Sequence, residues 1–335
     1  GCGSQAADTQ DTAAETTTDA AAETTDAAAE TTADAAGESS DQKFTVGICQ
    51  LVQHDALDAA TQGFEDALKE KYGDNVTIDY QNAQGDSATC STIVTGFVNN
   101  DYDLILANAT PALQAAVAAT TDIPILGTSV TDYGAALNLT DFTGTTGMNV
   151  SGTSDLAPLD QQEKMIVELV PDVKKVAILY CSAEANSKFQ ATEIEKYLDE
   201  DGIAYQEYPF ADSNDLQSVV NSAVSDCDAM YIPTDNTAAS NMTIVSNVTE
   251  PAGIPIICGE ENMCKAGGLA TLSISYYDLG YTTGQQAIRI LSEGEDVSTM
   301  AIEKAAATTK EYNASYAEAL GMTMPEDYVA IPDGE

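Results

Sequence analysis

The sequence predicts an α/β protein of two Rossmann-like lobes, each with a parallel sheet, joined by a hinge. From residue 43 onward, strand-like apolar runs alternate with helical patterns, which is typical of parallel sheets covered by helices on both faces. This alternation is interrupted once by a segment rich in Gly, Ser and Thr and then restarts. A chain of 335 residues, 44% of them hydrophobic, is also longer than a single core usually serves.

The first half contains four strand–turn–helix units. The segments that predict a strand leading into a turn are TVGIC (45–49), VTIDYQNAQGD (76–86), DLILANATPA (103–112) and IPILGTSVTD (123–132). Apolar residues at helical spacing predict helices over 56–71, 87–99, 112–119 and 133–138. The segment FTGTTGMNVSGTSDL (142–156) then predicts a crossover between the lobes.

The second half repeats the pattern. Strands are expected at the start of KVAILYC (175–181), in AYQEYPF (204–210), AMYI (229–232), GIPIIC (253–258) and LATLSIS (269–275), and after residue 300. Helices are expected after residue 184, over 213–224, 237–248 and 278–293, and near the end of 300–322. The expected domains are a first lobe of 43–150 plus about 276–297, a second lobe of 151–275 plus about 298–324, and a polar tail over 325–335.

The first 42 residues form a separate region, with ten acidic residues and neither Lys nor Arg. A helix there would stack like charges and bury nothing larger than Ala, so a solvated, disordered tether is expected. The chain begins GCGS, which resembles a processed bacterial lipoprotein with Cys2 as the lipidated residue. The alternative is a remnant of cloning, since Gly1 would be absent from a mature lipoprotein. We expect a lipid anchor on the extracytoplasmic face of the bacterial cell membrane.

Charge and composition exclude several classes of partner and chemistry. A net charge of −42 disfavours nucleic acid and anionic lipid headgroups, and no apolar run is long enough to span a membrane. No catalytic motif of the P-loop, nucleophile-elbow or HExxH kind occurs, so we expect no enzyme, no catalytic residue and no cofactor. A single His and the absence of CxxC argue against a metal site. Cys258 and Cys264 are close enough in sequence to bridge, and their pairing is left open.

The polar turns that follow the strands have the composition of a site for a free amino acid. In open α/β sheets the ligand lies beyond the carboxyl ends of the strands. A ligand carboxylate suits hydroxyls and amides at a helix start, which Thr110, Asn186 and Ser187 would provide. A ligand ammonium suits an acid, for which Asp235 and Asp132 are candidates. The alternative for each of these residues is a simple helix N-cap, and only their convergence on one cleft favours the ligand.

Seven segments, taken in order, resemble a known family. They are GICQLVQHDALDAATQGFEDAL, IDYQNAQGD, ANATPALQAA, CSAEANSKFQ, IPTDNTAAS, GGLATLSISYYDLGYTTGQQAIRIL and EALGM. They resemble the tryptophan/tyrosine-type substrate-binding lipoproteins of ABC importers, which have the periplasmic-binding-protein type I fold, over about residues 43–324. The resemblance implies a monomer that captures an aromatic amino acid (tyrosine, phenylalanine or tryptophan) in an interlobe cleft. It would deliver this ligand to a membrane permease driven by an ATPase.

The resemblance also implies a set of ligand-binding positions. These are Gln50, His54, Asn82, Thr110, Ser129, Asp132, Asn186, Ser187, Asp235, Asn236 and Asp278. Among them, His54 is expected to give a hydrogen bond or ring contact, or alternatively to lie on the surface. Two departures from the family, Tyr133 and the segment CGEENMCKAGG, are expected to border the side-chain pocket. Two rival functions remain: a receptor of the same fold for a nucleoside, sugar or branched-chain amino acid, and a surface adhesion lipoprotein.

Overall fold

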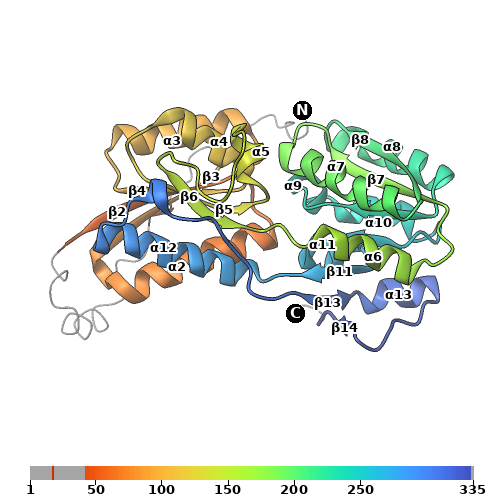
Figure 1. Cartoon of the computed structure of the whole chain (residues 1–335). Coiled ribbons are helices and arrows are strands. Elements are labelled where there is room, and N and C mark those ends of the chain that lie inside the picture. The colour runs from red at the N-terminus through yellow and green to blue at the C-terminus, as the bar shows by residue number, and fades with distance from the viewer. Residues whose placement is uncertain (1–16, 19–41, 333–335) are drawn as a thin grey trace. The chain divides into compact units, whose positions relative to one another are not determined.

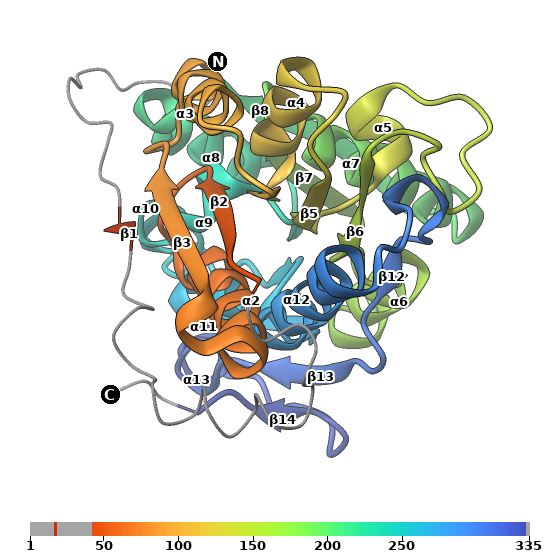
Figure 2. The same cartoon turned by 90° about the vertical axis from the view of Figure 1, so that its left-hand side faces the viewer.

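The computed structural model describes residues 17–18 and 42–332, which form two compact units (Figures 1 and 2). The first unit comprises residues 42–155 and 275–305, together with the short strand at residues 17–18. The second unit comprises residues 156–274 and 306–332. The chain therefore leaves the first unit after Asp155, returns at Ser275 and leaves again after Ala305.

The first unit is built on a seven-stranded sheet in the order β1-β3-β2-β4-β5-β6-β12. Its strands are β1 (Thr17–Thr18), β2 (Phe44–Gln50), β3 (Val76–Asn82), β4 (Leu104–Asn108), β5 (Ile125–Val130), β6 (Val150–Ser154) and β12 (Glu303–Lys304). All neighbouring pairs are parallel except the edge pair of β1 and β3. The central strands β4 and β5 are buried along their whole length, as expected for strands covered on both faces.

Helices cover both faces of this sheet (Figure 2). They are α2 (Asp55–Tyr72), α3 (Ser87–Asn99), α4 (Thr110–Ala119), α5 (Tyr133–Leu137) and α12 (Tyr276–Glu293), with 3-10 turns at Gly73–Asn75 and Val297–Thr299. Helices α3, α4 and α5 pack on one face, and α2 and α12 pack on the other. Glycines let α2 and α12 approach backbone to backbone, because a Cβ on Gly280 would lie 1.9 Å from the Ala60 carbonyl oxygen.

The second unit has its own seven-stranded sheet in the order β14-β13-β11-β10-β9-β7-β8. Its strands are β7 (Lys175–Cys181), β8 (Ala204–Phe210), β9 (Ala229–Ile232), β10 (Ile256–Cys258), β11 (Ala270–Ser273), β13 (Thr309–Tyr312) and β14 (Val329–Ala330). Only the pair of β11 and β13 is antiparallel. Its helices are α6 (Leu159–Leu169), α7 (Ala185–Glu200), α8 (Ser213–Asp226), α9 (Asn236–Ala239), α10 (Met242–Thr249), α11 (Glu261–Gly267) and α13 (Ala314–Leu320). One hydrophobic core joins these elements.

Several expectations from the sequence change in detail. The segment 142–156, expected to be a crossover, contains β6, which pairs with β5 and β12 inside the first unit. The expected helix over 237–248 is two helices, α9 and α10, and the helices α6 and α11 were not expected. The expected tail contains β14, and Tyr328 beside it is buried. Apart from Thr17–Thr18, the expected tether, with Cys2, lies outside the described residues.

Candidate functional site

The strand-end turns of the first unit lie at one edge of its sheet. Gln50, the last residue of β2, is in register with Asn82 at the end of β3 and with Asn108 at the end of β4. Asn108 is in turn in register with Thr128 of β5. The turns after these four strands therefore follow one another along this edge. Gln50, Asn82, Thr110 and Ser129 therefore lie along the same edge of the sheet.

Two hydroxyl groups at this edge are buried without a hydrogen-bond partner in the described part of the chain. They belong to Thr110, which is 2% exposed at the start of α4, and to Ser129, which is 8% exposed near the end of β5. Both occur beside backbone strain, since Ala109 has φ of 97° and Ser129 has φ of 57°. Buried polar groups are normally satisfied, and strain of this kind gathers at binding sites. This pair of hydroxyls is therefore the clearest sign of a ligand position in the first unit.

Other predicted residues of the first unit are engaged by the protein itself. Gln50 is fully buried, and its amide donates to the Val52 carbonyl at 2.9 Å and to Asp58 at 2.8 Å. Its oxygen accepts from the Thr61 hydroxyl at 2.6 Å. Gln50 therefore fastens the turn to α2. His54 is half-buried at the N-cap position of that helix.

Three further predicted residues lie in turns or at helix starts. Asn82 accepts from the Gln84 backbone N–H at 2.9 Å. Asp132 is the N-cap of α5 and accepts from the Ala135 N–H at 2.8 Å. Asp278 is exposed in the first turn of α12. Their contacts are those of helix caps and turns, the alternative that the sequence left open for such residues.

Tyr133 and the segment that starts at Cys258 were expected to border the side-chain pocket. Tyr133 is 1% exposed, packs against Gly127 and Gly152, and donates its hydroxyl to the Thr153 carbonyl at 2.8 Å. In the second segment, Glu260 is buried and caps α11 through the Asn262 and Met263 N–H groups. These side chains therefore contribute to the fold of their own units.

The second unit places Asp235 at the centre of a buried polar cluster. Asp235 follows β9 and is 3% exposed. Its carboxylate accepts from the Cys181 N–H at 2.7 Å, the Ser187 hydroxyl at 2.7 Å and the Ala238 N–H at 2.8 Å. Burial raises the pKa of Asp235 to about 8 and the nearby charge of Glu184 adds to the rise, although the hydrogen bonds that it accepts lower the pKa.

Glu184 is a second carboxylate beside Asp235, and the sequence analysis missed it. It is 6% exposed, and its oxygens accept from the backbone N–H groups of Asn236 and Thr237, each at 2.9 Å. The Asn236 side chain also donates to it at 3.0 Å. Glu184 caps α9, a helix that begins 52 residues further along the chain, so no local pattern could reveal its role.

Asn186 completes this cluster. Its amide nitrogen donates to the Thr234 carbonyl at 3.3 Å and to Glu184 at 3.3 Å. Its oxygen is buried without a partner in the described chain. Two carboxylates and an unpartnered acceptor thus lie together at the ends of β7 and β9, where a group with several N–H donors, such as an ammonium, would be bound.

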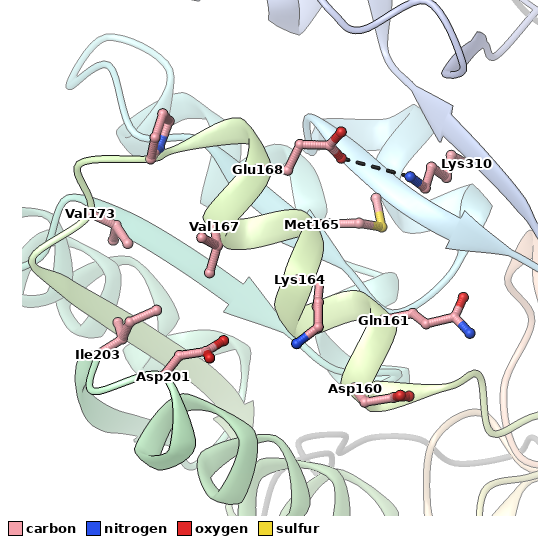
Figure 3. A pocket seen from close by; sticks show the side chains of 11 residues that line it. Asp160, Gln161, Lys164, Met165, Val167, Glu168, Val173, Asp201, Ile203 and Lys310 are labelled. Atoms are coloured by element: carbon pink, nitrogen blue, oxygen red, sulfur yellow. Dashed lines mark ion pairs between the residues drawn. The ribbon is translucent and has the colours of Figure 1, made fainter.

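A separate hollow of about 770 Å³ lies against α6, near the opposite ends of β7 and β8 (Figure 3). It is lined by Asp160, Gln161, Lys164, Met165, Val167, Glu168, Pro171, Val173, Asp201, Ile203 and Lys310. Lys310 already pairs with Asp327 at 3.0 Å and with Glu168 at 3.8 Å. None of the buried unpartnered atoms in the described residues belongs to its lining. The hollow therefore has fewer signs of a ligand than the strand-end turns.

In residues 17–18 and 42–332, no three His, Cys, Asp or Glu side chains gather as a metal ion would need. Within the same ranges, no helix has both the length and the apolar character to cross a membrane. Cys258 and Cys264 are both free and buried.

Comparison with known proteins gives consistent matches along most of the chain. A family model described as "ABC transporter substrate binding protein" matches residues 45–334. A protein of Clostridioides difficile named "Tyrosine-binding protein" is 41% identical over 268 residues, covering 79% of this chain and 77% of that protein.

Solved structures agree with this match. The ABC domain of Streptococcus pneumonia in complex with L-Trp is 33% identical, with a TM-score of 0.81, covering 85% of this chain and 97% of that one. A ligand-free, open substrate-binding protein with adhesive properties from Clostridium difficile is 39% identical, with a TM-score of 0.68, covering 87% and 100%. Together with the two mainly parallel sheets, these likenesses confirm the predicted fold class, the periplasmic-binding-protein type I fold.

Proposed function

Because the chain belongs to the ABC transporter substrate binding protein family, we propose that it captures an aromatic amino acid, namely tyrosine, phenylalanine or tryptophan, for an ABC importer. The observation that carries this proposal is the contrast between two sets of strand-end groups. The first unit offers buried hydroxyls without partners, and the second offers buried carboxylates with an unpartnered acceptor. The names of the tyrosine-binding relative and of the L-Trp complex support the aromatic class.

In this proposal each set of groups binds one charged end of a zwitterionic ligand. The ligand carboxylate binds the hydroxyls of Thr110 and Ser129 and the backbone N–H groups at the start of α4, where the helix dipole favours an anion. The ligand ammonium binds the acceptors of Asp235, Glu184 and Asn186.

The proposal includes a location and partners. Substrate-binding proteins of ABC transporters act outside the cytoplasm, and we propose that Cys2 carries the lipid that holds this monomer at the cell membrane. The permease and its ATPase would receive the ligand from the ligand-bound protein. The acidic region before residue 43 would act as a spacer between the lipid and the first unit.

A thermal-shift panel of the twenty amino acids, with nucleosides and sugars, tests the ligand class. At a ligand concentration of about a hundred times Kd, binding adds roughly 2.7 kcal/mol to the free energy of unfolding. We expect a shift with L-tyrosine, L-phenylalanine or L-tryptophan. N-acetyl-L-tyrosine, which lacks the ammonium, and L-tyrosinamide, which lacks the carboxylate, are controls that should give little shift. A response to sugars or nucleosides alone would replace the proposed ligand.

A second function is favoured by one comparison. The 39% identical structure from Clostridium difficile is described as having adhesive properties, so we propose surface adhesion as an additional candidate. Binding of the protein to cultured epithelial cells tests it, with a variant deficient in ligand binding alongside. Equal adhesion by the wild type and the variant would show that adhesion does not depend on ligand binding. If neither protein adheres, the adhesion function is ruled out.

A further inference from the structure

We infer that Asp155 is a positioning residue that ties the segment 129–132, which is the end of β5 and the turn after it, to the points where the chain leaves and re-enters the first unit. The inference rests on the proposed function, since this segment contains Ser129, which has one of the two unpartnered hydroxyls. Asp155 lies one residue beyond β6 and was not among the residues that the sequence singled out.

Asp155 contacts both the segment 129–132 and helix α12. Its carboxylate accepts from the Thr131 hydroxyl at 3.3 Å and from the Tyr276 hydroxyl, and its backbone N–H donates to the Val130 carbonyl at 3.0 Å. The preceding residue, Ser154, donates its hydroxyl to the Thr131 carbonyl at 2.7 Å. Asp155 and Tyr276 are 4% and 6% exposed. The residues directly after Ser129 are therefore held by the end of β6, and that end is held by the start of α12.

This arrangement matters for binding because Ser129 has an unfavourable backbone conformation. Ser129 has φ of 57°, and its hydroxyl forms no hydrogen bond within the described residues that would offset the strain, so its neighbours must hold it in place. Burial raises the pKa of Asp155, whereas the hydrogen bonds that it accepts from the hydroxyls of Tyr276 and Thr131 and from its own backbone N–H lower the pKa, so these donors favour its charged form. The loss of either donor should loosen the turn.

The chain path gives the contact a second consequence. Asp155 is the last residue before the chain leaves the first unit, and Tyr276 is the second residue after it returns. Their hydrogen bond joins these two segments inside the first unit. A change in the direction of either segment would therefore move Thr131 and, with it, the rest of the segment 129–132.

The test compares two buried tyrosine hydroxyls. That of Tyr276, at the start of α12, bonds to Asp155, and that of Tyr72 bonds to Ser292 near the end of α12. Tyr276→Phe removes the donor to Asp155, and we expect about tenfold weaker binding of the aromatic amino acid by calorimetry. We also expect faster amide hydrogen exchange confined to residues 129–133 in the ligand-free protein. The control is Tyr72→Phe, which removes a bond of 2.6 Å to Ser292 at the other end of α12. It should lower the melting temperature comparably, with affinity changed less than about twofold.

A conservative variant and a double variant separate positioning from general stability. Asp155→Asn keeps an acceptor of the same size and should retain more affinity than Asp155→Ala. Tyr276→Phe added to Asp155→Ala should cause no further loss, because the two residues act through one bond. Unchanged exchange at 129–133 together with unchanged affinity in Tyr276→Phe would overturn the inference. If the wild-type protein binds no aromatic amino acid, the proposed function fails, and the exchange comparison alone decides the role of Asp155.

Discussion

The turns that end the central strands differ between the two units in what their polar groups already contact. In the first unit, the hydroxyls of Thr110 and Ser129 have no partner within the described chain. In the second unit, Asp235 and Glu184 each accept several hydrogen bonds, and this cluster has more acceptors and negatively charged groups than donors. One set suits an anionic group and the other a cationic group, so the comparison points to a ligand that carries both charges.

The largest effect is expected from removing the charge of Asp235. Asp235→Asn keeps an acceptor for the start of α9 but cannot pair with an ammonium, so ligand affinity should fall by about 2–5 kcal/mol. Isothermal titration with L-tyrosine measures this loss. The matched control is Asp228→Asn at the other end of β9, where the carboxylate also accepts backbone N–H groups, from Lys174 and Lys175. Equal affinities for wild type and Asp235→Asn would remove the acidic cluster from the site.

The dependence of stability on pH should differ between wild type and Asp235→Asn. The pKa of Asp235 is about 8 in the folded protein, above the 3.9 of an unfolded chain. The folded state therefore binds the extra proton between about pH 4 and 8, and the free energy of unfolding falls as pH rises through that window. We expect an effect on the order of 1–3 kcal/mol, absent from Asp235→Asn. Urea unfolding of both proteins at pH 5 and 8 measures it, and a difference that does not vary with pH would contradict it.

Removing an unpartnered hydroxyl should weaken binding without weakening the fold. Thr110→Val replaces the hydroxyl by a methyl group of similar size, so the ligand-free melting temperature should stay the same or rise. Affinity for the aromatic amino acid should fall about tenfold. Thr128→Val is the control, because the Thr128 hydroxyl is buried and bonded to that of Thr153 at 3.1 Å. Thr128→Val should lose about 1 kcal/mol of stability and keep its affinity. If Thr128→Val loses affinity and Thr110→Val does not, Thr110 is not a ligand contact.

The smallest effect concerns the strained backbone beside Thr110. Ala109 has φ of 97°, a conformation that glycine adopts without strain, so Ala109→Gly should be neutral or stabilising by up to about 1 kcal/mol. Ala107→Gly, two residues earlier in β4, lacks this conformation and should destabilise. Chemical denaturation of both variants checks the pair. A larger loss in Ala109→Gly than in Ala107→Gly would show that the strain is unimportant.

Local patterns in the sequence were sufficient for most of the fold. The helices α2 and α3 were located to within one residue at each end, because their apolar spacing is regular and turns bound them. Helix α6 was missed because it follows a segment rich in Gly, Ser and Thr that was taken as a crossover. Helix α11 was missed because it is only seven residues long and includes Asn262, Cys264 and Gly267, which are weak helix formers. Short helices of this kind are fixed by tertiary packing rather than by propensity.

The candidate site could be predicted only where its signal is local. Thr110 was found because a hydroxyl follows a strand and precedes a proline at a helix start. Glu184 was missed because the amides that it accepts from lie 52 and 53 residues away. Asp155 was missed for the same reason, since its partners lie 24 and 121 residues away. Residues whose function depends on distant partners leave no periodic trace in a single sequence.

The glycine contact between α2 and α12 has a consequence for biosynthesis. Phe64 and Leu68 of α2 share their core with Ala287 of α12, and no side chain larger than hydrogen fits at Gly280. Helix α12 is translated only after residues 156–274 of the second unit. On the ribosome, the first unit therefore exposes this apolar face of its sheet until the chain beyond residue 293 emerges, and a transcript truncated before that point should yield an aggregation-prone product.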